Sequence, residues 1–162
     1  MRSNLSAGTL AGLIAGVPFG IMMTMMQAPT PDGESLPMMA MVAMVVRSNS
    51  LAAGWIYHLF NSAVIGALFG WILGSRVRGV GSGMGWGAGY GIVWWVLGGL
   101  ILMPMLLGMP PFAPLQMPMM RPVAFASLLG HLMFGLILGA TFVPLRGRGS
   151  VSAASLGSAR HA

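Results

Sequence analysis

The stretches HLFNSAVIGALF at residues 58–69 and HLMFGLILGATF at residues 131–142 read as two copies of one segment. Each copy begins with histidine, carries a glycine eight residues later and ends on phenylalanine, and the copies lie seventy-three residues apart. We interpret this as a tandem repeat of two-helix units that runs through most of the chain. The same offset pairs further residues: Gly12, Ala15 and Gly16 with Gly85, Ala88 and Gly89, Pro37 with Pro110, and Met44 with Met117.

Composition predicts that these helices lie in a membrane. Of the 162 residues, 56% are hydrophobic and 6% are charged, and the mean hydropathy is +0.83, which leaves too little polar surface for a water-soluble domain. Four stretches without charged residues, 3–31, 48–75, 79–120 and 122–145, each exceed the roughly 20 residues that cross a bilayer. The sequence therefore predicts an all-α integral membrane protein with four transmembrane helices.

The repeat divides the chain into two units and a tail. We expect a first unit at residues 1–78 with spans at about 5–27 and 51–74, and a second unit at 79–146 with spans at about 83–105 and 123–143. Pro104, Pro110 and Pro111 should end the third helix near residues 102–107. Residues 37–46 read as a short interfacial helix, apolar on all sides, that a partner subunit would cover. Residues 147–162 read as a flexible cytoplasmic tail.

Arginine placement predicts the orientation of the spans. Six arginines fall on one side of a four-span chain: Arg2, Arg76, Arg78, Arg146, Arg148 and Arg160. Arg47 and Arg121 fall on the other side, as do the acids Asp32 and Glu34. By the positive-inside rule both termini are cytoplasmic, and no cleavable signal is expected. The net charge of +6 is then a topology signal. Nucleic-acid binding is not predicted, because the sequence lacks a basic face with interleaved aromatic residues.

Small residues recur every four positions in each span, and this spacing places them on one helical stripe. Glycine on such a stripe lets helix backbones approach closely, which predicts a tightly packed pseudo-twofold bundle of the glycine-zipper kind. Span three carries two such rows, at Gly81, Gly85, Gly89 and at Gly83, Gly87, Gly91. The packing residues that we predict are Gly8, Gly12, Gly16, Gly20, Gly66, Gly70, Gly85, Gly89, Gly135 and Gly139.

The two repeated histidines are the candidate cofactor-binding residues. His58 and His131 lie on the small-residue stripes, about seven or eight residues from the outer ends of their spans, and so at a common depth. Two imidazoles at one depth could ligate a haem b from both sides, or one chlorophyll-type pigment each. The alternatives are that each ring hydrogen-bonds a neighbouring helix, or that the pair relays protons, although neither span contains a carboxylate.

Methionine is the second unusual feature, with 17 residues clustered on the predicted outer side. Thioether sulfur is a soft ligand that suits Cu(I), and this makes copper a candidate metal. The alternative is that these flexible side chains fill irregular surfaces or contact a partner protein. The candidate metal ligands are Met38, Met41, Met117, Met119 and Met120.

Patterns typical of catalysis are absent from the sequence. The glycines of residues 79–91 match a GxGxxG-like spacing, but no strand precedes them and the chain contains no lysine, so they do not predict a phosphate loop. No serine, histidine and carboxylate fall within one plausible site, and no paired-carboxylate or HExxH motif occurs. Trp94 and Trp95 lie mid-span, where they could stack on a ligand or fill a partner groove. We therefore expect a protein that is not an enzyme.

The glycine-rich first span and the sequence GHLMFGLILG in the last span resemble small four-span bacterial membrane proteins of the YagU-like kind. This resemblance implies an inner-membrane protein without an assigned catalytic activity. The leading hypothesis is a non-catalytic accessory or assembly subunit of a larger membrane complex, in energy transduction, with membrane-protein partner subunits or further copies of itself in the bilayer. A haem, pigment or copper carrier is the second hypothesis, and a small oligomeric channel or transporter is the third.

Overall fold

The computed structural model describes residues 2–29 and 34–158, so the predictions for Asp32, Arg160 and the last four residues lie outside the described residues. The described chain is helical apart from one short hairpin and the connecting turns. In order, the elements are α1 (Arg2–Met25), β1 (Gln27–Pro29), β2 (Ser35–Pro37), α2 (Met38–Val45), α3 (Leu51–Leu73), α4 (Val80–Trp94), the π-helix η1 (Trp95–Leu102), α5 (Met103–Leu106), α6 (Ala113–Gln116), the 3₁₀ turn η2 (Pro118–Met120) and α7 (Arg121–Ser158).

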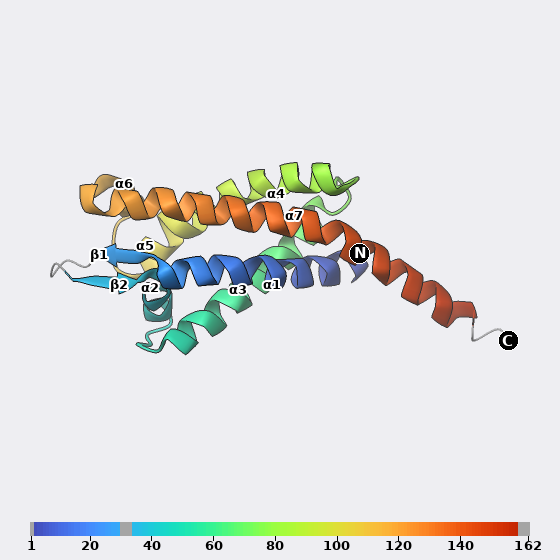
Figure 1. Ribbon diagram of the computed structural model, residues 1–162, viewed down its shortest axis with the longest axis horizontal. Helices are drawn as coiled ribbons and strands as arrows, with labels where there is room; N and C mark the ends of the chain where they lie inside the picture. Colours follow the sequence, from blue (N-terminus) through green and yellow to red (C-terminus); the bar gives the residue numbers. More distant parts are fainter. Residues whose placement is uncertain (1, 30–33, 159–162) are drawn as a thin grey trace.

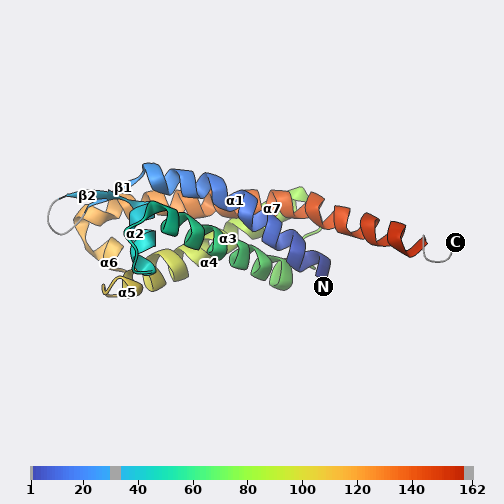
Figure 2. The ribbon, with the colours of Figure 1, turned by 90° about the horizontal axis from the view of Figure 1, so that it is seen from below.

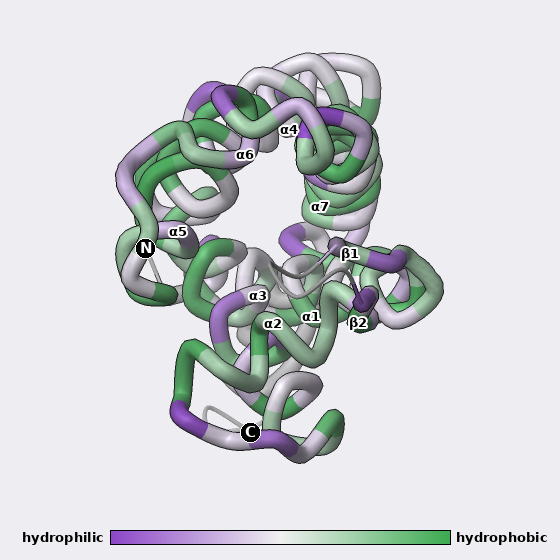
Figure 3. Tube along the Cα trace, turned by 90° about the vertical axis from the view of Figure 1, so that its left-hand side faces the viewer, coloured by the Kyte–Doolittle hydropathy of each residue, from purple (hydrophilic) through white to green (hydrophobic). Residues whose placement is uncertain are grey.

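Within the described residues, four helical segments are long and apolar enough to cross a membrane, as the sequence predicts. They are Ser3–Met25, Leu51–Leu73, Val80–Leu106 and Pro118–Gly147. The third combines α4, η1 and α5, and its helix ends at Leu106, within the window that the prolines predict. In Figure 3 most of the chain is white or green, the colours of intermediate and hydrophobic residues, and purple hydrophilic residues are few and scattered.

The four long helices form two pairs that meet through their central members. α3 packs along α1, α4 packs along α7, and α1 packs along α7, whereas α3 and α4 meet at few positions. Figures 1 and 2 show α1 and α7 running side by side through the bundle. The Tyr90 hydroxyl donates a hydrogen bond to the Ile65 carbonyl at 2.8 Å and is one of the ties between the outer helices.

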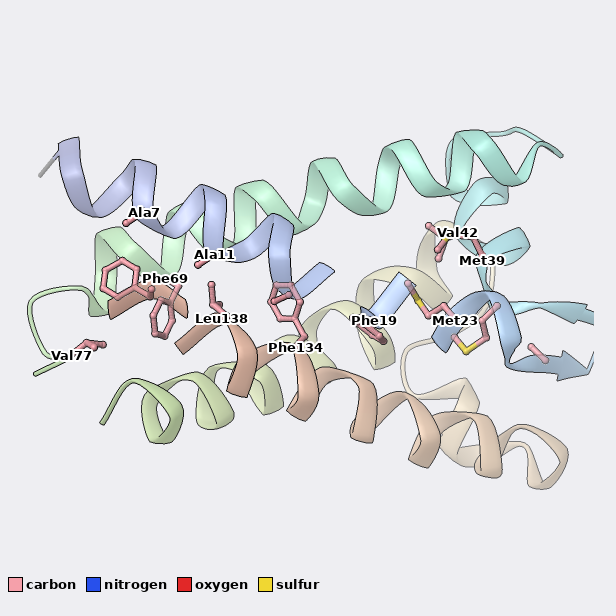
Figure 4. Close-up of a cluster of buried hydrophobic side chains, with 14 residues drawn as sticks. Ala7, Ala11, Phe19, Met23, Met39, Val42, Phe69, Val77, Phe134 and Leu138 are labelled. Atoms are coloured by element: carbon pink, nitrogen blue, oxygen red, sulfur yellow. The ribbon is translucent and has the colours of Figure 1, made fainter. Parts of the chain in front are cut away.

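The bundle core lies between α1 and α7. Along α1, Ala7, Ala11 and Ala15 are buried at four-residue spacing, next to the glycine row that faces α3. Across from them, α7 buries Phe134, Leu138 and Phe142, and α3 adds Phe69 (Figure 4). Phe69 and Phe142 meet edge to face at 5.5 Å between ring centroids. Small residues on α1 therefore accept large ones from α7, which fills the core without separating the helices.

The short elements gather at one end of the bundle (Figure 1). Strands β1 and β2 pair antiparallel with Ala28 opposite Leu36, a hairpin that the sequence analysis did not predict. Helix α2 matches the expected interfacial helix, and the Met39 and Ala43 side chains on it are fully buried. Gly54 of α3 approaches the Met39 carbonyl. Part of the cover that we expected from a partner thus comes from the chain itself, while Met44 remains about half exposed.

The opposite end joins the pairs through Arg146 of α7. Its guanidinium donates to the Val77 carbonyl at 3.1 Å and to the Gly74 carbonyl at 2.6 Å, in the turn between α3 and α4. α7 then continues to Ser158 and leaves the bundle (Figure 1), where we predicted a flexible tail from residue 147.

Candidate functional site

The candidate site is a cavity between the outer helices, in the half of the bundle that carries α2 and the hairpin. Its volume is about 280 Å³, and it is partly open to the surroundings of the protein. α3 and η1 form facing walls, α7 contributes a third, and α2 with the turn after α5 surrounds the end. The cavity exists because α3 and α4 diverge here, although both pack closely on the central helices.

The π-helix η1 forms much of one wall. Its residues Gly98, Gly99 and Leu100 line the cavity, and the wider turn of a π-helix displaces this segment from the path of α4. The Trp95 indole holds the segment against α7 by donating to the Ala124 carbonyl at 3.1 Å. π-helical segments occur frequently at functional sites. Trp94 lines the cavity, as expected of a ligand-facing side chain, whereas Trp95 serves as a tie between helices.

His58 is buried between α3 and α1. Its Nε2 lies 2.8 Å from the Gly16 carbonyl, and because a carbonyl only accepts, Nε2 carries the proton and donates. The His58 carbonyl in turn accepts from the Ser62 hydroxyl at 2.8 Å. His58 therefore links two membrane-spanning helices, which is the role we gave as the alternative to cofactor binding.

His131 differs from His58 in the bond it makes. Its Nδ1 donates to the carbonyl of Ser127 on the same helix, at 2.8 Å. In a neutral imidazole this leaves a lone pair on Nε2, and Nε2 has no hydrogen-bond partner among the described residues. The ring borders the cavity. Of the two predicted cofactor-binding residues, only His131 thus reaches a space that a ligand could enter.

The ring of Phe19 packs against both histidines. Its centroid lies 5.5 Å from the His58 ring and 4.8 Å from the His131 ring, edge to face in both cases. A haem ligated by the two histidines would have to lie where Phe19 lies. A buried phenylalanine thus fills the approach between the two rings, and each imidazole keeps one nitrogen that does not donate. The shared haem b stays a prediction.

The predicted methionine ligands divide into two groups. Met38, Met41 and Met120 line the cavity, whereas Met117 and Met119 do not. Met119 is half exposed in η2, so the five methionines do not converge on one cavity wall. Within the described residues, no group of three or more His, Cys, Asp or Glu side chains could hold a metal ion. The methionines that do line the cavity give it a flexible apolar wall.

Most of the predicted packing glycines lie against a neighbouring backbone or ring. A Cβ placed on Gly66 would meet the Gly8 carbonyl, and one on Gly135 would meet the Gly87 carbonyl. Contacts of the same kind involve Gly12 with Ser62, Gly16 with Ser62, Gly20 with Trp55, Gly70 with Asn4, and Gly139 with Gly83.

The prediction for Gly85 and Gly89 needs correction. A Cβ on either residue would meet nothing within 4 Å among the described residues, and the same holds for Gly81. The α4 glycines that contact α7 are Gly83, Gly87 and Gly91. Two residues along a helix turn the side-chain direction so far that the two rows lie about 160° apart around the axis. Adding seventy-three to the numbers of the α1 glycines therefore gives the row of α4 that does not contact α7.

Asn61 is the residue of the site that sequence reasoning missed. It lies in the middle of the α3 span, lines the cavity one turn after Tyr57, and its side chain makes no hydrogen bond within the described residues. An amide in the middle of an otherwise apolar span is visible in the sequence, and an unpaired amide in hydrocarbon costs about 4–8 kcal/mol on a cyclohexane scale. That cost was the signal by which it could have been found.

Comparison of the chain with protein-family models, with curated proteins and with solved structures finds no match. The resemblance to YagU-like membrane proteins therefore stays a prediction.

Proposed function

We propose that this chain is a non-catalytic accessory or assembly subunit that docks laterally, through α4, onto another membrane helix in the bacterial inner membrane. In this proposal both termini are cytoplasmic, and the energy-transducing complexes are the first class of partner assembly to examine. The observation that carries it is the bare row Gly81, Gly85 and Gly89 on the side of α4 that faces away from α7.

These three glycines, where an added Cβ would meet nothing within 4 Å in the described part of the chain, weaken the helix. Glycine in a helix interior is less favourable than alanine by roughly 0.8–1 kcal/mol per residue. Lipid chains need no glycine to pack against, whereas a second helix does, because glycine removes the side chain that would hold two backbones apart. Met84 and Trp86 are partly exposed beside the row and would extend such a contact.

We also propose that the pairs α1/α3 and α4/α7 are the two halves of a tandem repeat packed through glycine. Support comes from equivalent contacts in the two pairs. Gly66 lies against Gly8 in the first pair, and Gly139, seventy-three residues after Gly66, lies against Gly83 in the second. The second pair then carries a glycine row that its own fold does not use, and this row is the docking face.

A photoreactive benzophenone amino acid at Trp86 tests the docking face in native membranes. We expect a discrete cross-linked product, whose mass shows whether the neighbour is another protein or a second copy of this chain. Gly85→Leu in the same background should remove the product, because a leucine there separates the two helices. The matched control is the same amino acid at Ile56, which is exposed on α3 away from the row and should cross-link only to lipid. A product that survives Gly85→Leu, or none at Trp86, would refute the proposal.

A further inference from the structure

The cavity between α3 and η1 is elongated and extends from the candidate membrane-spanning helices to α2 and the turn after α5. Its α7 wall extends from Met120 to His131, eleven residues or about 16 Å of helix. Its volume of about 280 Å³ is close to the lower end of the roughly 300–1,000 Å³ that ligand pockets occupy. A narrow, partly open cavity at this depth takes its contents from the bilayer, and its shape suits a molecule with one chain.

Apolar side chains make up most of the wall, and methionines are prominent among them. The lining thioethers are those of Met23, Met38, Met41, Met103, Met109 and Met120. Such unbranched side chains adapt to ligands of irregular shape. The wall therefore favours a hydrocarbon without fixing its length or branching.

Three side chains in the wall have a polar atom without a hydrogen-bond partner among the described residues: Asn61, His131 at its Nε2, and Tyr57 at its hydroxyl, one turn before Asn61. The first two set what the ligand must offer, because Tyr57 can itself donate or accept. The Asn61 side chain makes no hydrogen bond within the described residues, and it presents both an N–H donor and a carbonyl acceptor. His131 has its proton fixed on Nδ1 by the Ser127 carbonyl, so its Nε2 can only accept from a neutral ligand. A ligand that satisfies both Asn61 and His131 needs a donor and an acceptor, and a hydroxyl supplies both from one atom, since it donates to Nε2 and accepts from the Asn61 amide. A ketone, ester or ether cannot donate.

We propose that this cavity binds a membrane-dissolved molecule that consists of a hydrocarbon chain and a hydroxyl-bearing head, with the hydroxyl between Asn61 and His131. Phenols, hydroquinones and long-chain alcohols share this chemistry. The site is separate from the docking face on α4, so either proposal can fail without the other.

The test uses 4-dodecylphenol as the probe and its methyl ether, 4-dodecylanisole, as the matched control that lacks only the O–H donor. Binding to the purified full chain in detergent is followed by native mass spectrometry. We expect the phenol to bind about tenfold more tightly than the ether, since one hydrogen bond made in place of an unpaired group contributes about this factor. A phenol and an ether of equal affinity would overturn the proposal, as would failure of both to bind.

Two variants assign the effect to its residues. Asn61→Leu should weaken phenol binding about tenfold, whereas Phe60→Leu, on the exposed side of the same helix, should leave it unchanged. His131→Phe should abolish the preference for phenol while ether binding persists, which shows that the cavity itself is intact. If His131→Phe keeps the preference, or Asn61→Leu and Phe60→Leu act alike, the assignment is wrong.

Discussion

Each of the two helix pairs, α1/α3 and α4/α7, contains one histidine, and the two histidines make different hydrogen bonds. In the first pair, His58 donates across the interface to the Gly16 carbonyl of α1. In the second, His131 donates back into its own helix at Ser127 and leaves Nε2 facing no partner within the described residues. One histidine is thus a link between two helices, and the other is part of a cavity wall.

The neighbours of the first helix in each pair differ as well. α1 is packed on two sides, with its glycine row on α3 and its row of buried alanines toward α7. α4 packs one glycine row on α7, and its opposite row meets nothing within 4 Å among the described residues. α1 therefore has neighbours on both of its small-residue faces, whereas α4 has a neighbour on only one of them within the described chain.

The largest effect should follow from a bulky residue at the contact that the pairs have in common. In Gly139→Leu the new side chain would meet the Gly83 carbonyl, and in Gly66→Leu it would meet the Gly8 carbonyl. Because backbone must move in both cases, we expect each variant to lose about 3 kcal/mol of unfolding free energy, the upper part of the range for overpacking. The measurement is the midpoint of unfolding by sodium dodecyl sulfate in mixed micelles.

Gly79→Leu is the control, since a Cβ there meets none of the described residues within 4 Å. If Gly66→Leu is destabilised and Gly139→Leu is not, then the two pairs are not held together in the same way, and the proposed repeat loses its support.

A smaller effect should separate the two histidines. His58→Phe keeps a ring against Phe19 and Trp55 but removes the bond to α1, and interhelical bonds of this kind contribute about 0.6–2 kcal/mol. His131→Phe removes only a bond within α7, so we expect a loss of less than half as much. Equal losses in the same micelle assay would mean that His131 also holds two helices together.

Much of the fold could be predicted from composition and spacing. Charge-free stretches long enough to cross a bilayer locate the four spans, and proline locates the end of the third helix, because both signals reflect local physical constraints. The hairpin of β1 and β2 was missed because each strand has three residues, too few for an alternating pattern.

The choice between the two glycine rows of α4 could not be made from the sequence. Glycine occupies every second position from residue 79 to residue 91. Two opposite faces of the helix therefore each carry a glycine row, and each row matches the pattern of α1. Contact decides it: Gly8 and Gly83 take equivalent places against Gly66 and Gly139, an offset of seventy-five rather than seventy-three. The cavity likewise depends on η1 and on the divergence of α3 from α4. No residue pattern in the sequence predicts either feature.

The most direct test of the account places one substitution on each face of α4, two residues apart. Gly87→Leu should lower the unfolding midpoint of the isolated chain, because the side chain would meet the Gly135 carbonyl. Gly85→Leu should leave that midpoint unchanged and instead reduce the mass of the assembly extracted from native membranes, measured by native mass spectrometry. If Gly85→Leu destabilises the isolated chain as Gly87→Leu does, or leaves the assembly intact, then α4 does not carry a docking face.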